Sequence, residues 1–410
     1  MKSSGGSVRS RERAAFWLRW GLASALRCCC WSGRSKLKQS CDVLIVGGGP
    51  AGLAAAIALR LRGADVLVAD ALQPPIDKAC GEGLMPDSLD ALSRLGVDLP
   101  PDAGAPFRGI RFVDERSFVS AEFGGGRAGL GIRRLTLHSL LVRRAEEAGV
   151  RTAWGSPVVV QNGLPIRVGG ERCRYQWLVG ADGHASRVRS WAGLEDRTLK
   201  HRRFGFRMHY RVRPWSPYVE IHWSDLGQAY VTPLSEQEVC VAVVSRFPER
   251  ARVREFVNSN PLLRARLYGA EATTRERGAI TTSSRLRRVV SGNVALVGDA
   301  SGSVDAITGE GLAVAFRQAA LLTESIAAGD LARYASQHAG TLRVPQTIAA
   351  AMLLMDQRPS LRRRVLRVFA ERPALFQKLL TVHLREEPLP KLLLRYGPEL
   401  GARLLLAGQF

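Results

Sequence analysis

The chain of 410 residues is strongly basic, with 59 Lys and Arg against 37 Asp and Glu and a formal net charge of +22. Hydrophobic residues make up 46% and charged residues 23%, which is ordinary for a globular protein with room for about two or three domains. No apolar run is long enough to cross a bilayer, so a transmembrane helix is not expected. The charge suits an anionic surface, but no nucleic-acid-binding module is recognisable, so nucleic acid is not an expected partner.

The first 40 residues differ from the rest in composition, because nine Lys and Arg face a single acid, Glu12. Arg19 interrupts the apolar stretch 14–26, which argues against a secretory signal peptide. We expect residues 1–40 to form a basic, disordered extension, with a targeting segment or a peripheral membrane anchor as alternatives. The seven cysteines lack the spacing of a zinc site or a disulfide framework, so no metal is expected and a reducing cytoplasm fits best.

The first informative motif covers residues 41–53, where a short apolar strand runs into glycines and then into a helix-forming segment. A Gly-x-Gly-x-x-Gly pattern between a strand and a helix is the fingerprint of a dinucleotide site. The first glycine allows a tight turn, the second lets the backbone approach a pyrophosphate, and the third lets the helix pack on the strand. The expected cofactor-binding residues in this motif are Gly47, Gly49, Pro50, Ala51 and Gly52.

The segment after the glycines completes a strand–helix–strand unit. We expect a helix from Leu53 to Arg62 and a second buried strand over residues 65–70, ending in Asp70. An acid roughly 20 residues after the glycines accepts hydrogen bonds from a ribose and repels a 2′-phosphate. The sequence therefore predicts FAD or NAD, rather than NADP, as the ligand of this motif.

Two further apolar strands end in a glycine–aspartate pair. The first is followed by Asp182 and Gly183, and the second by Gly298 and Asp299. Asp-Gly after a strand is by itself only a common turn signal. An acid at a strand end can bind a chain of hydroxyl groups, so the pair at Gly298 and Asp299 is expected to contact the cofactor.

A glycine turn after the last of these strands opens a helix that is expected to end near Ala327. A helix N-terminus stabilises negative charge on a flavin ring, so this turn is expected at the reactive end of the cofactor. The turn residues assigned to cofactor binding are Gly309, Glu310, Gly311 and Leu312.

The three motifs, in this order, resemble the group A flavoprotein monooxygenase superfamily, which has the p-hydroxybenzoate hydroxylase fold. The resemblance covers residues 41 to about 345. It implies FAD as the cofactor and NADH or NADPH as the reductant. It also implies that Asp70 binds the adenosine ribose, that Asp299 binds the ribityl chain and that Asp182 lies near the pyrophosphate. Arg134 matches the family's arginine at the start of a helix and is expected to face FAD.

Two segments are more similar to the geranylgeranyl reductase branch of this superfamily, namely Lys-Ala-Cys-Gly-Glu-Gly-Leu at 78–84 and Thr-Gly-Glu-Gly-Leu at 308–312. In addition, Ala306 stands where aromatic hydroxylases usually have a proline. The reaction type therefore stays open. The leading expectation is a monooxygenase that hydroxylates or epoxidises a hydrophobic or aromatic small molecule through a flavin C4a-hydroperoxide. The alternative is a reductase of carbon–carbon double bonds in an isoprenoid or similar lipid, and a remote alternative is a non-catalytic basic binding protein.

The residues between the second and third motifs alternate in polarity, which predicts an antiparallel sheet over the flavin. The expected strands cover 204–212, 218–223, 228–233 and 238–245. A glycine-rich loop before the sheet is also expected to reach the flavin. The sequence fixes no catalytic residue, and the candidates for the substrate pocket are Cys80, Glu82, His209, Tyr210, His222, Trp223 and Tyr230.

The expected fold is therefore α/β, with a Rossmann-like FAD-binding domain, an inserted antiparallel substrate sheet and C-terminal helices. We expect the FAD-binding domain over 41–200 and 286–345, the substrate sheet over 201–285 and the helices over 346–410. The helices suit a lid, a dimer surface or a basic amphipathic patch on an anionic membrane. The expected location is cytoplasmic, with membrane association as the alternative, and the oligomeric state stays open.

Overall fold

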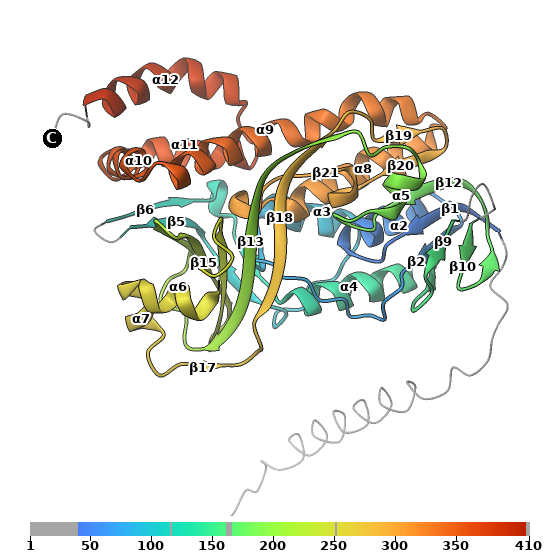
Figure 1. The fold of residues 1–410 in the computed structure, drawn as a ribbon, viewed down its shortest axis with the longest axis horizontal. Helices are drawn as coiled ribbons and strands as arrows, with labels where there is room; N and C mark the ends of the chain where they lie inside the picture. The colour runs from blue at the N-terminus through green and yellow to red at the C-terminus, as the bar shows by residue number, and fades with distance from the viewer. Residues whose placement is uncertain (1–39, 115–116, 161–165, 251, 407–410) are drawn as a thin grey trace, which may run out of the picture. The chain divides into compact units, whose positions relative to one another are not determined.

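The computed structural model describes residues 40–406, except 115–116, 161–165 and 251. The predictions for residues 1–39 lie outside this range. Figure 1 shows two main sheets with helices packed around them and a group of helices at the C-terminal end. Among the described residues, no helix is both long enough and apolar enough to cross a membrane.

The first sheet has the strand order β19-β20-β12-β1-β2-β8. Its neighbouring strands pair in parallel, except for β19 with β20. Val43, Leu44 and Ile45 of β1 are fully buried, as expected for a central parallel strand that is covered on both faces. The strands are β1 (Ser40–Val46), β2 (Val66–Ala69), β8 (Arg151–Ala153), β12 (Arg174–Gly180), β19 (Val290–Ser291) and β20 (Val294–Leu296).

Helix α2 (Pro50–Leu61) follows β1 directly and contacts helices α4 and α8. It begins three residues before the expected Leu53, because the fixed backbone of Pro50 suits the first turn of a helix. The other helices of this part are α3 (Pro86–Arg94), α4 (Arg134–Glu147), α5 (Arg187–Trp191) and α8 (Gly311–Ala327), with 3-10 turns η1 (Gly124–Gly126), η2 (Gly298–Ser301) and η3 (Ala306–Thr308).

The second sheet follows the order β21-β18-β13-β16-β15-β14-β5-β6, and β17 pairs with β13. It is antiparallel except where β14 meets β5. Figure 1 shows β13 and β18 running side by side along their length. The strands are β5 (Gly109–Val113), β6 (Phe118–Glu122), β13 (Arg197–Arg211), β14 (Val219–Ser224), β15 (Gly227–Ser235), β16 (Glu238–Ser245), β17 (Glu271–Ala272), β18 (Arg277–Leu286) and β21 (Gly302–Ser303).

Two small sheets complete the strands, with the orders β11-β10-β9 and β3-β7-β4. The second of these lies beside the loop that holds Cys80, because β3 begins at Gly83. The strands are β3 (Gly83–Leu84), β4 (Ala105–Phe107), β7 (Gly129–Gly131), β9 (Val158–Val159), β10 (Arg167–Val168) and β11 (Glu171–Arg172).

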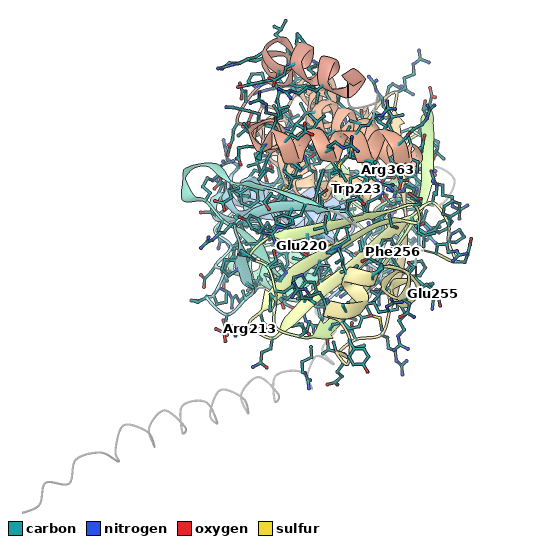
Figure 2. All side chains as sticks on the ribbon, turned by 90° about the vertical axis from the view of Figure 1, so that its left-hand side faces the viewer. Arg213, Glu220, Trp223, Glu255, Phe256 and Arg363 are labelled. Carbon is teal, nitrogen blue, oxygen red and sulfur yellow. The ribbon has the colours of Figure 1, made fainter. Side chains whose placement is uncertain are left out.

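Each face of the second sheet packs against a different layer. One face packs against α6 (Val253–Ser259) and α7 (Pro261–Arg266). The apolar core between them includes Met208, Val241 and Phe256. The other face packs against the C-terminal helices. Figure 2 labels Phe256 and Trp223, which belong to these two separate apolar cores.

The C-terminal helices are α9 (Leu331–Gln357), α10 (Pro359–Glu371), α11 (Pro373–His383) and α12 (Leu389–Leu406). Their apolar faces join the sheet in one core, in which the Phe112 ring lies 4.6 Å from Phe376 and 5.5 Å from Trp223. The predicted architecture of an α/β domain with a substrate sheet and C-terminal helices is confirmed.

Candidate functional site

A cavity of about 680 Å³ opens at the carboxyl ends of the parallel strands. Its walls include the residues that end β1 and β2 and the turns after β12 and β20, together with the inner face of the second sheet. The carboxyl edge of a parallel sheet is where α/β proteins bind ligands, so this cavity is the candidate cofactor and substrate site.

Most of the predicted cofactor residues line this cavity, although they come from six separate segments of the chain. Gly52 and Glu310 do not line it. Glu310 turns instead toward Arg317 and His383, at 3.4 and 3.5 Å. The binding roles of the lining residues stay predictions. The predicted residues that line the cavity are Gly47, Gly49, Pro50, Ala51, Asp70, Arg134, Asp182, Gly183, Gly298, Asp299, Gly309, Gly311 and Leu312.

The three fingerprint glycines have distinct environments. Gly47 has a φ of +111°, and a Cβ there would lie 2.4 Å from the Ala181 carbonyl oxygen. A Cβ on Gly52 would lie 2.0 Å from the Gly47 oxygen, so this glycine allows the helix to close onto the turn. Among the residues that the structure describes, a Cβ on Gly49 would meet nothing within 4 Å, and no side chain caps helix α2. The helix N-terminus therefore presents free backbone to the cavity, as a pyrophosphate requires.

Two of the strand-end acids already bind backbone groups of the protein. Asp70 accepts from the Gly48 N–H at 2.7 Å and from the Leu72 N–H at 2.8 Å. Asp182 accepts from the Ser186 hydroxyl at 2.5 Å and from the Arg187 N–H at 2.7 Å. Asp182 thereby fixes the turn into α5, and it lines the cavity beside Gly183.

The third acid, Asp299, forms an ion pair with Lys78 at 2.6 Å across the cavity. Burial alone would raise the pKa of Asp299, but the Lys78 ammonium outweighs it and lowers this pKa. The carboxylate raises the pKa of Lys78 in turn. Arg134 lies nearby, buried, and its Nη1 has no hydrogen-bond partner among the described residues. A buried cation with an unused donor fits an anionic cofactor such as FAD.

Successive side chains of a strand point to opposite faces of the sheet, so the candidate pocket residues are distributed over both faces. Tyr230 lies opposite Ile221, and both line the cavity. His222 is one residue further along β14 and pairs with Ala229, so it points to the other face, where it contacts Glu220 at 3.0 Å. Tyr210 also belongs to the other face, in the core with α6. Trp223 shares the cavity face but is buried in the core beyond the cavity.

A buried cluster of charged side chains binds the loop that contains Cys80 and Glu82. Arg207 of β13 donates to both oxygens of Asp77 at 2.9 Å and to Glu82 at 3.1 Å. His209 contacts the other Glu82 oxygen at 2.6 Å. These contacts hold Glu82 at a φ of +59°, which few residues other than glycine adopt.

Arg207 therefore binds the loop at both of its ends, Asp77 and Glu82. The residues between these two acids, 78–81, line the cavity. Burial raises the pKa of the Cys80 thiol, so the cavity wall carries a neutral thiol. His209 contacts the Glu82 carboxylate but does not itself line the cavity. Cys80, Glu82 and Tyr230 are thus the candidates that the structure brings together.

Sequence reasoning missed two residues of this site, Lys78 and Arg207. Lys78 stands two positions before Cys80, within the segment that resembles the reductase branch. Arg207 alternates with Phe206 and Met208 and shares the strand parity of Gly205, which lines the cavity. The alternation of side chains along the strand was therefore visible in the sequence. Only the pairing of the strand with its neighbours shows which set of alternate residues faces the cavity.

His338 of α9 supports the Gly-Asp turn and gives a prediction on pH. Its Nε2 contacts the Ser301 hydroxyl at 2.9 Å and Gln318 at 3.0 Å. Burial lowers the pKa of His338 from 6.5 to about 4. Between these values the unfolded chain takes up a proton and the folded chain does not, so stability falls as the pH falls, by up to about 3 kcal/mol.

Urea unfolding of the natural protein and of a His338→Gln variant measures this contribution. Near neutral pH the variant is expected to be less stable, because glutamine replaces the imidazole contacts imperfectly. The difference between the two proteins is expected to shrink as the pH approaches 4. A difference that stays constant over this range would contradict a neutral buried imidazole.

Comparison with known proteins gives three informative similarities. A family model described as "FAD binding domain" matches residues 40–330. The chain is 29% identical over 326 residues to a menaquinone reductase of Mycobacterium tuberculosis, covering 72% of this chain and 78% of the relative. It is 25% identical to a digeranylgeranylglycerophospholipid reductase of Methanocella arvoryzae, covering 67% and 74%.

Among solved structures, the chain is similar to a probable FAD-dependent monooxygenase from Pseudomonas aeruginosa. The TM-score is 0.64 at 21% identity, covering 78% of this chain and 97% of that protein. At this identity the likeness concerns the fold.

Proposed function

The chain belongs to the FAD binding domain family and is an FAD-dependent oxidoreductase, and we propose that it reduces a carbon–carbon double bond of a prenyl lipid. NADH or NADPH is the proposed reductant. The two relatives described above, which each cover two thirds or more of this chain, are named as reductases of menaquinone and of a digeranylgeranylglycerophospholipid. This choice reverses the order of the two reaction types expected from the sequence.

The observation that carries the proposal is the apolar wall of the cavity on the sheet side. Tyr230 is the one ionisable side chain that β14, β15 and β16 contribute to this wall among the described residues. Its hydroxyl donates to the Ile307 carbonyl at 2.6 Å, and burial raises its pKa. This wall therefore offers no base to activate a phenol, and it suits a hydrocarbon chain. Its other residues include Val219, Ile221, Thr232, Ala242 and Val244.

When bound, FAD supplies the hydride for the reduction. The residues that would hold it are the lining residues of the three motifs, with Arg134 facing its negative charge. The N-terminus of α8 points into the cavity at Gly311 and stabilises negative charge there. The apolar sheet wall excludes water from the reacting carbons. Saturation also requires a proton, and the neutral Cys80 thiol holds one at Sγ in the cavity wall.

Monooxygenation is the second candidate, because a structure of the same fold is a probable FAD-dependent monooxygenase. The two reactions differ in their use of oxygen. NAD(P)H oxidation should therefore be measured with prenyl lipids and, in parallel, with phenols and polyketides, with and without oxygen. We expect prenyl lipids to stimulate oxidation without oxygen and to lose a double bond. Stimulation that requires oxygen and yields a hydroxylated or epoxidised product would overturn the proposal.

A further inference from the structure

The outward side of helix α12 carries exposed leucines beside basic side chains. Leu393 and Leu394 are 53% and 83% exposed, and Leu394 is the most exposed leucine among the described residues. Lys391 and Arg395 flank them and are also exposed. Residues three and four apart lie on one side of a helix, so Lys391, Leu394 and Arg395 share a surface, and Leu393, two residues from each cation, is exposed at its edge. We call these four residues the α12 face.

The opposite side of the same helix is packed. Leu392 is buried, and Tyr396 and Leu400 lie against the apolar core of the C-terminal helices. Arg395 lies over the Tyr396 ring, with its guanidinium carbon 5.3 Å from the ring centre. The helix therefore has its own inner apolar stripe, and the exposed leucines are additional to it. A helix that presents leucine beside Lys and Arg suits a membrane interface.

The charge around the α12 face is positive in sum, although Lys391 pairs with Glu387 at 3.6 Å. Residues 358–406 contain eleven Lys and Arg and four Glu. On α10, which contacts α12, Arg363 and Arg367 are exposed and form no ion pair with any described residue. Figure 2 labels Arg363 on this helix. An anionic partner would neutralise these cations, whereas a second copy of the same surface would be repelled.

The same helices are continuous with the cavity wall. One apolar core contains Ile221 and Tyr230 of the cavity and also Phe376 and Leu380 of α11. Apolar side chains thus extend from the cavity to the layer on which α12 packs.

We propose that the α12 face, together with Arg363 and Arg367, docks the protein on an anionic phospholipid bilayer. Leucines insert at the level of the headgroups, and arginines contact lipid phosphates. That the enzyme takes its substrate from this bilayer rests on the proposed function. The docking itself depends on the surface alone.

Flotation of the FAD-loaded full chain with lipid vesicles tests the docking. We expect binding to phosphatidylcholine vesicles that contain phosphatidylglycerol, little binding to phosphatidylcholine alone, and weaker binding at high salt. Changing both Leu393 and Leu394 to Ser is expected to weaken binding about tenfold. An Arg363→Glu, Arg367→Glu variant is expected to weaken it at least as much.

The matched control changes Leu262 and Tyr268 to Ser, which are 43% and 89% exposed near α7. Its binding is expected to equal that of the natural protein. Equal binding by the leucine variant would overturn the proposal, as would binding that ignores lipid charge. Dimers that the leucine variant abolishes, without vesicle binding, would assign the α12 face to contacts between copies.

Activity on a detergent-dissolved prenyl lipid separates this proposal from the proposed function. The leucine variant is expected to keep that activity and to lose turnover of lipid held in vesicles. If vesicle binding behaves as expected but no prenyl lipid is reduced, the docking stands and the proposed reaction is wrong.

Discussion

Replacing Arg207 with methionine is expected to lower the free energy of unfolding by about 3–5 kcal/mol. The change leaves the Glu82 carboxylate buried with its main cation removed, and it also removes one of the two arginines that pair with Asp77. A buried charge without its partner has a large desolvation cost, and methionine fills the space without replacing the charge. Urea unfolding monitored by tryptophan fluorescence measures the loss.

The matched control is Arg211→Met on the same strand. Arg211 pairs with Glu271, and both side chains are 63% exposed, so the expected loss is about 0–1 kcal/mol. Similar losses of unfolding free energy in the two variants would contradict the assignment of Arg207 as the residue that holds the cavity loop in place.

A milder variant keeps this prediction testable if Arg207→Met does not fold. Asp77→Asn weakens the contact of Arg207 with one end of the loop and leaves the contact with Glu82 in place. We expect Cys80 to react faster with iodoacetamide in this variant, because the loop opens more often. Bound FAD is expected to slow the reaction again. Unchanged reactivity would mean that other contacts fix the loop.

Replacing Gly49 with alanine is expected to weaken FAD binding roughly a hundredfold, about 2.7 kcal/mol, while leaving the fold intact. A Cβ at Gly49 meets no atom of the described part of the chain within 4 Å, so the unfolding free energy should change by less than about 0.5 kcal/mol. The methyl group instead occupies the space where the pyrophosphate approaches the backbone. Titration of the FAD-free protein with FAD, followed by flavin fluorescence, gives the affinity.

The comparison variant is Gly52→Ala. Its Cβ would lie 2.0 Å from the Gly47 oxygen, so we expect a loss of stability of about 1–3 kcal/mol. The two glycines thus separate ligand approach from helix packing. If Gly49→Ala bound FAD as tightly as the natural protein, the pyrophosphate could not lie at this turn.

The cofactor end of the site could be predicted from the sequence because its determinants are local. A glycine turn, a strand and a helix lie within a few residues of one another, and the parallel strands bring their carboxyl ends to one edge of the sheet. Asp70 and Gly298 could therefore be placed in one site although they are far apart in the chain.

The substrate end depends on which face each strand turns inward, and a shift of one residue reverses that face. The sequence contains the alternation of β13 but not its register against β16, so Tyr210 and His209 could not be separated. Glu310 shows a related limit, because its neighbours in the turn line the cavity while its side chain pairs with Arg317. The long-range partners of Lys78 and Arg207 require the folded chain.

The most direct test of the account is a single turnover without oxygen. Enzyme whose FAD has been reduced in advance is mixed anaerobically with a prenyl lipid, and flavin absorbance and lipid mass are followed together. We predict that the flavin is reoxidised and that the lipid gains two hydrogen atoms. A flavin that stays reduced until oxygen is admitted, with an oxygen atom then found in the product, would contradict a double-bond reductase.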